Sequence, residues 1–223
     1  MSKVNKQDLA QALLALYQGT VEFNRIGGKP LHPDLEDSQK EVTLEECLEA
    51  LEGLVKSDKI LLVDGLIDTL ITASFMQMII DKNDSLSREH LGYFNVEGKS
   101  KEVLAGNLLT AILKEKWIDV VEIAEDLLYI TDENCIANVY EILESNFSKY
   151  VPCNLIDSPE DMCEAIESEG RYTGVEYFTE KLSSGQEVYV FTAVYDTKNK
   201  KSFSKPKIVK PKGFFKEPQL IIN

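Results

Sequence analysis

Two groups of carboxylates in the first third of the chain have the spacing of metal ligands. Glu45, Glu46 and Glu49 form the first group, and Asp64 and Asp68 form the second. Residues three or four positions apart share one face of an α-helix, so each group would present its side chains together. Crowded carboxylates repel one another unless protons or cations neutralise them. A set of oxygen ligands suits a hard cation, Mg²⁺ first and Mn²⁺ next.

Two predicted helices carry these groups. In both segments, aliphatic side chains recur at three- and four-residue spacing, which is typical of amphipathic helices: Leu44, Leu48, Leu51 and Leu54, then Ile60, Val63, Ile67, Leu70 and Ile71. The polar segment Lys56-Ser57-Asp58 separates the two runs, and either Ser57 or Asp58 can cap the second helix. The pattern therefore predicts an antiparallel helical hairpin.

The geometry of such a hairpin predicts which carboxylates meet. With the turn centred just before Ser57, Glu49 lies opposite Asp64, and Glu45 lies opposite Asp68. A glutamate run taken alone is usually a solvated helix face. The aspartates favour a metal site instead, because their segment is apolar nearly all round and aspartate is rarely buried without a partner.

Together, the two groups resemble the motifs of the MazG-like superfamily of all-α nucleoside triphosphate pyrophosphohydrolases, most closely its phage and phosphoribosyl-ATP-pyrophosphohydrolase-like branch. In that family, Glu-Glu-x-x-Glu on one helix and Glu-x-x-Asp on the next hold Mg²⁺ over the nucleotide phosphates. Here Gly65 occupies the usual glutamate position and Asp64 precedes it, as in the phage branch. Phe23–Pro30, with Asn24 where histidine is common, is similar to the segment before the first motif. Ser145–Lys149 is similar to the Ser-Asn-x-Ser-Lys element that closes the helical core.

The resemblance, which covers roughly residues 15–150, implies the reaction and the roles. A nucleoside triphosphate and water would give the monophosphate and pyrophosphate, by attack on the α-phosphorus with Mg²⁺ or Mn²⁺ as cofactor. The four metal ligands would be Glu46, Glu49, Asp64 and Asp68. Glu45 is either a further ligand or the base that orients water. Asn146 and Lys149 are candidates to bind a phosphate and the sugar or base, or they simply finish a helix. Relatives of this family associate, so a homodimer or homotetramer is expected.

Charge limits the classes of partner. The chain of 223 residues has a formal net charge of −14, which would repel a nucleic-acid backbone, so we expect no nucleic-acid polymer as a partner. The charge is uneven, because residues 1–197 hold 16 basic and 37 acidic side chains, whereas the remainder holds eight lysines and one glutamate. This basic tail either folds over the site of its own or a partner subunit, or is solvated.

The predicted fold class is mainly α: an all-α nucleoside triphosphate pyrophosphohydrolase helical bundle with a small α+β C-terminal appendage. We place the MazG-like helical catalytic core at residues 1–151 and the appendage at 152–223. Two strands, Val175–Thr179 and Glu187–Tyr195, are predicted to form a hairpin through Ser183–Gln186. The Lys/Pro-rich end is too rich in proline for a central strand.

The remaining predicted helices are a first helix that ends at Gly19, one over Val103–Leu113 capped by Ser100, one over Trp117–Ile130, and a last one that reaches Phe147 after a cap at Thr131 or Asp132. Residues 24–37 are predicted to form a long loop, and residues 86–99 a short helix and a loop. Ser38–Glu41 match a capping box that would start the acidic helix. A second acidic run, Glu122–Asp126, is either the exposed face of its helix, which is the preferred interpretation, or a further donor to the site.

Four cysteines without any Cys-x-x-Cys pairing argue against a zinc site and favour a reducing compartment. No uninterrupted apolar run approaches about 18 residues, so no membrane span is expected. The N-terminal apolar run Leu13–Leu16 is too short for a signal peptide, so none is expected. The expected location is cytoplasmic, or the host cytoplasm if the protein is viral. Two other functions stay open: a non-catalytic nucleotide- or metal-binding regulatory helical protein, and an interaction protein that docks through its basic tail.

Overall fold

The computed structural model of the chain describes residues 4–86, 94 and 96–222. Its contacts divide the chain into two compact units. The first runs up to Val21, from Pro30 to Leu143 and again from Gln219, and the second contains residues 22–29 and 144–218. The predicted mainly α chain with a small antiparallel sheet near its C-terminal end is confirmed.

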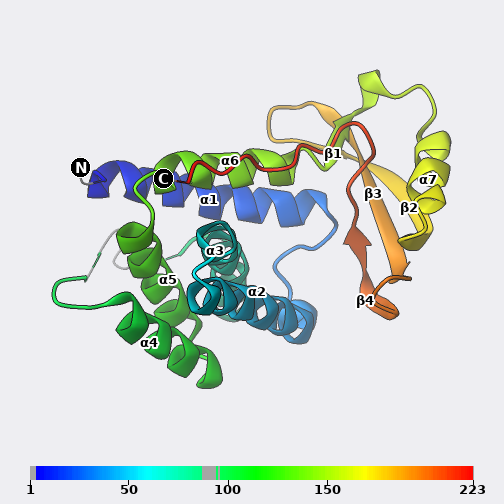
Figure 1. Cartoon of the computed structure of the whole chain (residues 1–223). Coiled ribbons are helices and arrows are strands. Elements are labelled where there is room, and N and C mark those ends of the chain that lie inside the picture. Colours follow the sequence, from blue (N-terminus) through cyan, green and yellow to red (C-terminus); the bar gives the residue numbers. More distant parts are fainter. Residues whose placement is uncertain (1–3, 87–93, 95, 223) are drawn as a thin grey trace. The chain divides into compact units, whose positions relative to one another are not determined.

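The helical elements come first in the chain (Figure 1). They are α1 (Lys6–Ile26), the 3₁₀ turn η1 (Pro33–Leu35), α2 (Glu36–Lys56), α3 (Lys59–Asp81), α4 (Lys101–Leu113), α5 (Trp117–Thr131) and α6 (Cys135–Phe147). The later elements are β1 (Tyr150–Pro152), η2 (Cys153–Leu155), α7 (Pro159–Ser168), β2 (Tyr172–Lys181), β3 (Glu187–Asp196) and β4 (Lys201–Ile208). The short helix and loop expected over residues 86–99 lie largely outside the described residues.

The predicted hairpin of α2 and α3 is present, and Figure 1 shows the two helices side by side. Asp58 caps α3, because its carboxylate accepts a hydrogen bond of 3.1 Å from the backbone N–H of Leu61. Ser57 ends α2 in the left-handed conformation, with a φ of 57°. The turn is therefore Ser57-Asp58, and its centre lies one residue later than predicted.

The buried face of α2 is not the predicted leucine face. Leu44 and Leu48 are 39% and 50% exposed, respectively. The buried side chains on α2 are small instead, and they are Thr43, Cys47, Ala50 and Gly53. Both sets have helical spacing, so periodicity alone could not distinguish them. Small residues allow two helix backbones to approach closely, and this is what happens here.

Two glycines mark the closest approach of α2 to α3. A Cβ atom on Gly65 would lie 2.6 Å from the backbone N of Ala50, and one on Gly53 would lie 2.4 Å from the backbone N of Leu62. Real Cβ contacts are essentially never below 3.0 Å. The hairpin therefore depends on glycine at both positions.

The helix α3 is long and apolar enough, by length and composition, to cross a membrane. Its most apolar window is 67% buried inside the structure, and core helices of soluble proteins pass the same test. The apolar character of α3 is thus weak evidence for a membrane span. It is accounted for by burial, since α3 packs against α2 and α5.

Three predicted boundaries near α1 and α2 are wrong. The first helix continues through Gly19 to Ile26, because buried Tyr17 and Thr20 on either side of the glycine hold it in the helix. The loop is correspondingly shorter than residues 24–37. Ser38 does not cap α2, which begins at Glu36; its hydroxyl donates a 3.0 Å hydrogen bond to the carbonyl of Leu35.

The preferred interpretation of the second acidic run, that it is the exposed face of α5, is also wrong. Glu125 and Asp126 are only 2% and 5% exposed. The hydroxyl of Tyr17 donates a 2.6 Å hydrogen bond to Glu125, and the ammonium of Lys99 lies 3.6 Å from the carboxylate of Asp126. These residues are buried polar parts of the helical core, and each has a partner, as burial requires. By contrast, the predicted cap of α4 at Ser100 is confirmed.

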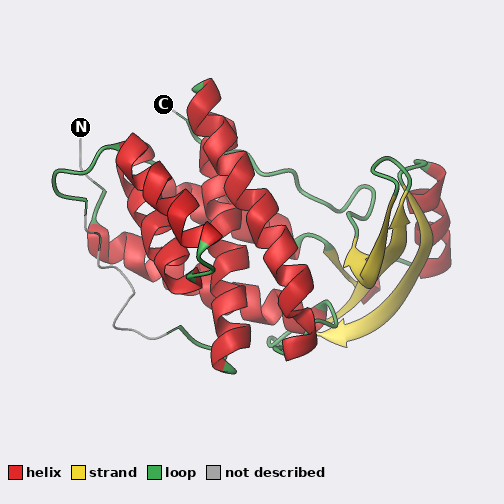
Figure 2. Ribbon diagram, turned by 90° about the horizontal axis from the view of Figure 1, so that it is seen from below, coloured by secondary structure: helices red, strands yellow, loops and turns green. Residues whose placement is uncertain are grey.

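The second unit is built on a four-stranded antiparallel sheet in the described part of the chain. The central strand is β3, with β2 along one edge and with β1 and β4 sharing the other. Figure 2 shows α7 against the sheet, where it packs on β2. The predicted hairpin turn lies between Lys181 and Glu187, and Pro206 falls on an edge strand, in keeping with its missing N–H.

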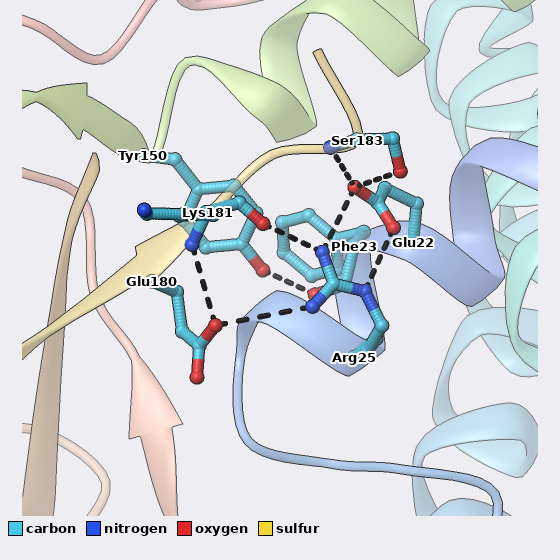
Figure 3. Close-up of polar contacts among 7 residues, drawn as sticks. All are labelled: Glu22, Phe23, Arg25, Tyr150, Glu180, Lys181 and Ser183. Atoms are coloured by element: carbon cyan, nitrogen blue, oxygen red, sulfur yellow. Dashed lines mark hydrogen bonds and ion pairs between the residues drawn. The ribbon is translucent and has the colours of Figure 1, made fainter. Parts of the chain in front are cut away.

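A polar network ties the end of α1 to the β2–β3 turn (Figure 3). The carboxylate of Glu22 accepts hydrogen bonds from Arg25 Nε at 2.9 Å, from the Ser183 N–H at 2.8 Å and from its hydroxyl at 2.7 Å. Arg25 also donates to the carbonyl of Lys181 at 2.7 Å. The bonds from Arg25, followed by those from Ser183, outweigh burial and lower the pKa of Glu22 to about 2.

Gly65→Ala should destabilise the first unit. The added methyl group would meet the backbone of Ala50, which cannot move aside as a side chain can. We expect a loss of at least about 2 kcal/mol in the free energy of unfolding, measured by urea denaturation followed by helical circular dichroism. Gly106→Ala is the matched control, because Gly106 occupies an exposed position of α4 and nothing lies within 4 Å of its Cβ position. It should stabilise by roughly 0.5–1 kcal/mol, and equal effects of the two changes would contradict the close contact.

Glu22→Gln should lower stability at neutral pH by about 1–2 kcal/mol. Because the pKa of Glu22 is lower in the folded chain, its contribution is fully present above the ordinary pKa near 4.5 and is lost as the pH falls toward 2. The difference between parent and variant should therefore shrink over that window in urea denaturation curves. Glu187→Gln, which breaks only an exposed ion pair with Lys181, should change stability by less than about 0.5 kcal/mol at any pH.

Candidate functional site

The five predicted carboxylates lie on the two helices of the hairpin. Glu45, Glu46 and Glu49 project from α2, and Asp64 and Asp68 project from α3. Glu46 and the two aspartates are partly buried, whereas Glu45 and Glu49 are exposed. The cluster thus has an inner part on the seam and an outer part open to solvent.

The electrostatics of Glu46 show that the other four carboxylates act on it. Burial, and then four neighbouring negative charges, raise the pKa of Glu46 to about 8; the charges, in decreasing order, are those of Asp68, Glu49, Glu45 and Asp64. The pKa of Glu49 is also raised, by burial first and then by Glu45, Asp64 and Glu52. The charges of all five carboxylates of the two groups therefore meet at Glu46.

The pairing across the hairpin follows the corrected turn. Asp64 acts on Glu49, as predicted. Asp68 is the strongest charge acting on Glu46, whereas the prediction placed it opposite Glu45. This difference in the partner of Asp68 follows from the turn, whose centre lies one residue later than predicted. The later turn places Asp68 opposite a residue of α2 nearer to the turn than Glu45.

The contact at Gly65 explains why the second helix departs from the Glu-x-x-Asp pattern. Gly65 faces the backbone of Ala50, so no side chain fits at this position. The acidic residue one step earlier, Asp64, lies at the edge of the seam instead and is partly buried. The small residues at helical spacing on α2, from Thr43 to Gly53, are the sequence signal for this close packing. The signal could be interpreted only with the knowledge that α3 packs on that face.

Below the carboxylates, the seam is lined by neutral groups. Cys47 is buried, and burial raises the pKa of its thiol to about 11, against a smaller opposite effect of its contact with the Thr69 hydroxyl. The thiol is therefore protonated at neutral pH and does not join a ligand set. Oxygen atoms alone would serve as donors here.

Among the described residues, no three histidine, cysteine, aspartate or glutamate side chains are arranged to hold a metal ion. The chemistry of the donors nevertheless suits a hard cation, because the interacting groups are all carboxylates. In the chain by itself, a proton on Glu46 relieves part of the repulsion, as its raised pKa indicates. A divalent cation would replace that proton.

Asn146 and Lys149 lie together in the second unit, whereas the carboxylates belong to the first. The ammonium of Lys149 donates a 2.6 Å hydrogen bond to the side-chain oxygen of Asn146. It also lies 5.4 Å from the centre of the Phe23 ring, within cation–π range. The two polar side chains are thus held in a defined arrangement on one aromatic residue.

Several lysines of the basic tail form ion pairs. The ammonium of Lys216 lies 2.9 Å from Glu144, and that of Lys210 lies 3.6 Å from Glu217. The last described residues return to the first unit, where buried Asn138 accepts from the N–H of Ile221 at 2.8 Å and donates to its carbonyl at 3.1 Å. These contacts argue against a wholly solvated tail.

Comparison of the chain with protein-family models, with curated proteins and with solved structures gives no match.

Asp68→Asn should make the metal-free protein as stable as the parent or more stable, by about 0.5–2 kcal/mol. Asparagine keeps nearly the same shape and removes the charge that acts most strongly on Glu46. Mg²⁺ should raise the melting temperature of the parent and that of the variant much less. Thermal melts in EDTA and in Mg²⁺ measure both effects.

Asp84→Asn is the matched control, because Asp84 is exposed just after α3. It makes the same chemical change and should alter neither the melting temperature nor the response to Mg²⁺. If Asp68→Asn melts well below the parent in EDTA, Asp68 is a structural residue and the repulsive cluster is wrong.

Proposed function

We propose that this chain is a Mg²⁺-dependent nucleoside triphosphate pyrophosphohydrolase of the MazG-like type, converting a (deoxy)nucleoside triphosphate and water into the monophosphate and pyrophosphate. The observation that carries the proposal is the meeting of five carboxylates where α2 and α3 approach most closely. Such a cluster destabilises the folded chain unless a cation binds, and natural proteins keep costly arrangements of this kind mainly at functional sites.

The chain's own residues would hold the metal on the seam. The proposed ligands are Glu46, Glu49, Asp64 and Asp68. When bound, Mg²⁺ supplies positive charge that neutralises the phosphate oxygens during phosphoryl transfer. The glycine contacts fix α2 against α3, so the ligands start from a rigid frame and lose little further freedom on binding.

Glu45 is the proposed base of the reaction. It is exposed at the outer edge of the cluster, where water can reach it. Its carboxylate would accept a proton from the attacking water as the new bond to the α-phosphorus forms. The bond between the α-phosphorus and the bridging oxygen breaks at the same time, and pyrophosphate leaves with that oxygen.

Asn146 and Lys149 are the proposed substrate contacts. The ammonium of Lys149 is a compact positive charge with N–H donors, which is the kind of group that binds a phosphate oxygen. The amide of Asn146 then keeps the lysine oriented. The alternative, that the pair only finishes α6, predicts no effect of Lys149→Met on the Michaelis constant.

A homodimer or homotetramer is also part of the proposal. Apolar side chains of the hairpin are exposed, including Val55 at 84% and Ile60 at 60% near its tip and Leu48 at 50% farther along α2. Clustered exposed apolar residues are typical of association surfaces. The expected location remains the cytoplasm.

A second candidate function has one observation in its favour. Gly65 stands where the resembled family has a ligand, and the packing leaves no room for that ligand. A chain that binds Mg²⁺ and nucleotide without turnover would be a regulatory protein. A docking role for the basic tail is less favoured, because part of its charge is used in ion pairs.

Incubation with a panel of nucleoside and deoxynucleoside triphosphates in Mg²⁺ should release pyrophosphate and monophosphate in equal amounts. Excess EDTA should abolish release, since the carboxylates alone repel the substrate. Asp68→Asn should lower the rate by at least about a hundredfold, because a metal ligand is lost, whereas Asp84→Asn should leave it unchanged. Release of orthophosphate and a diphosphate would contradict the proposed reaction, and binding of the nucleotide without release would favour the regulatory protein.

A further inference from the structure

A tight turn at the end of α1 fixes the position of Lys29. Gly28 has a φ of 71°, in the left-handed region that favours glycine. Its N–H donates to the carbonyl of Arg25 at 3.1 Å, and the N–H of Lys29 donates to the carbonyl of Asn24 at 2.8 Å. These are the two hydrogen bonds of a Schellman motif, so the backbone of Lys29 is held against the helix end.

The same turn lies directly against β4. A Cβ atom on Gly27 would be 2.3 Å from Cδ1 of Ile208 and 3.1 Å from the hydroxyl of Tyr150, so a larger residue would require the side chain of Ile208 to move. Lys207 precedes Ile208 on β4, where it pairs with Ala193 of β3. The contact at Gly27 places the backbone of Lys29 near that of Lys207, and the charge of Lys207 acts on Lys29. Two lysines that are far apart in the sequence therefore lie in one part of the second unit.

The ammonium of Lys29 has no counter-charge in this place. Lys29 is partly buried, and within residues 4–86, 94 and 96–222 it forms no side-chain hydrogen bond or ion pair. Burial first, and then the charge of Lys207, lower its pKa. The chain has 38 acidic side chains, yet none of the described ones pairs with Lys29. A cation in such surroundings is unfavourable until an anion binds.

We propose that Lys29 and Lys207 form a binding site for a phosphate or pyrophosphate anion within the second unit. Lysine binds phosphate as a compact point charge with three donors, and two lysines match the charge of such an anion. Apolar side chains lie beside the turn that carries Lys29: Ile208 lies against Gly27, and the ring of Phe178 lies 3.7 Å from the Cβ position of Gly28. The site uses no carboxylate and needs no metal.

The test is calorimetric titration of the full chain with sodium pyrophosphate in excess EDTA at low ionic strength. The parent should bind, and added salt should weaken the binding. Lys29→Met and Lys207→Met should each weaken it at least tenfold. Lys198→Met is the matched control, because it removes the same charge from an exposed position of the same unit. Its affinity should stay within twofold of the parent.

Two outcomes would overturn the site. One is that Lys29→Met and Lys198→Met bind pyrophosphate with equal affinity, which would mean that binding depends only on the net charge of the chain. The other is a Lys29→Met variant that melts well below the parent without ligand, because removal of an uncompensated cation should not destabilise the fold. If Lys29→Met does not fold, the pyrophosphate affinity of Lys207→Met can be compared with that of Lys198→Met instead.

The same titration separates this site from the proposed hydrolase. Asp68→Asn should bind pyrophosphate in EDTA as the parent does, even though it should not hydrolyse nucleotides. A chain that never hydrolyses nucleotides but binds pyrophosphate through Lys29 supports the site and contradicts only the hydrolase. Titration with adenosine monophosphate identifies the source of the anion: tighter binding than that of inorganic phosphate indicates a nucleotide, and equal binding indicates a free anion. Both results support the site.

Discussion

The close contact between α2 and α3 is the constraint on which the candidate site depends. Helices with larger side chains at Gly53 and Gly65 would lie farther apart, and the negative charges of α3 would act less strongly on α2. The glycines are costly in a helix, by roughly 1 kcal/mol each relative to alanine. Burial of the small face of α2 against apolar α3 compensates for that cost. The packing that stabilises the hairpin is therefore also what crowds the carboxylates.

The crowding of the carboxylates destabilises the folded chain, whereas the burial of apolar side chains on α3 stabilises it. Burial is the largest cause of the raised pKa of Glu46, and repulsion by Asp68 is the next. The hairpin tolerates it because most of α3 is buried in an apolar core. A flexible hairpin would relax by separating its charges, whereas the close backbone contact at Gly65 keeps the two helices together. This rigidity is what the proposed cation site requires.

Local signals in the sequence predicted most elements, and distant partners decided where prediction failed. The cap at Asp58 and the strand hairpin were predictable because a few neighbouring residues determine them. The buried face of α2 was not, because leucines and small residues there share one period and only the presence of α3 selects between them. The burial of Glu125 depends on Tyr17, a residue 108 positions away in the chain. A pattern of neighbouring residues therefore could not predict that Glu125 is buried.

The division of charge between the units changes the meaning of the basic tail. The second unit contains 13 acidic and 13 basic side chains, so the whole net charge of −14 belongs to the first. The tail lysines are therefore balanced within their own unit, and a long-range role for a free basic arm loses its support. What remains is local: the crowded carboxylates around Glu46 in the first unit, and the ammonium of Lys29 in the second, which pairs with none of the described acidic side chains. The two groups have opposite charges, so the proposed ligands differ: a divalent cation for the carboxylates and a phosphate for the lysines. Because each group lies within one unit, the proposed binding of the cation and that of the anion can be measured separately on the same chain.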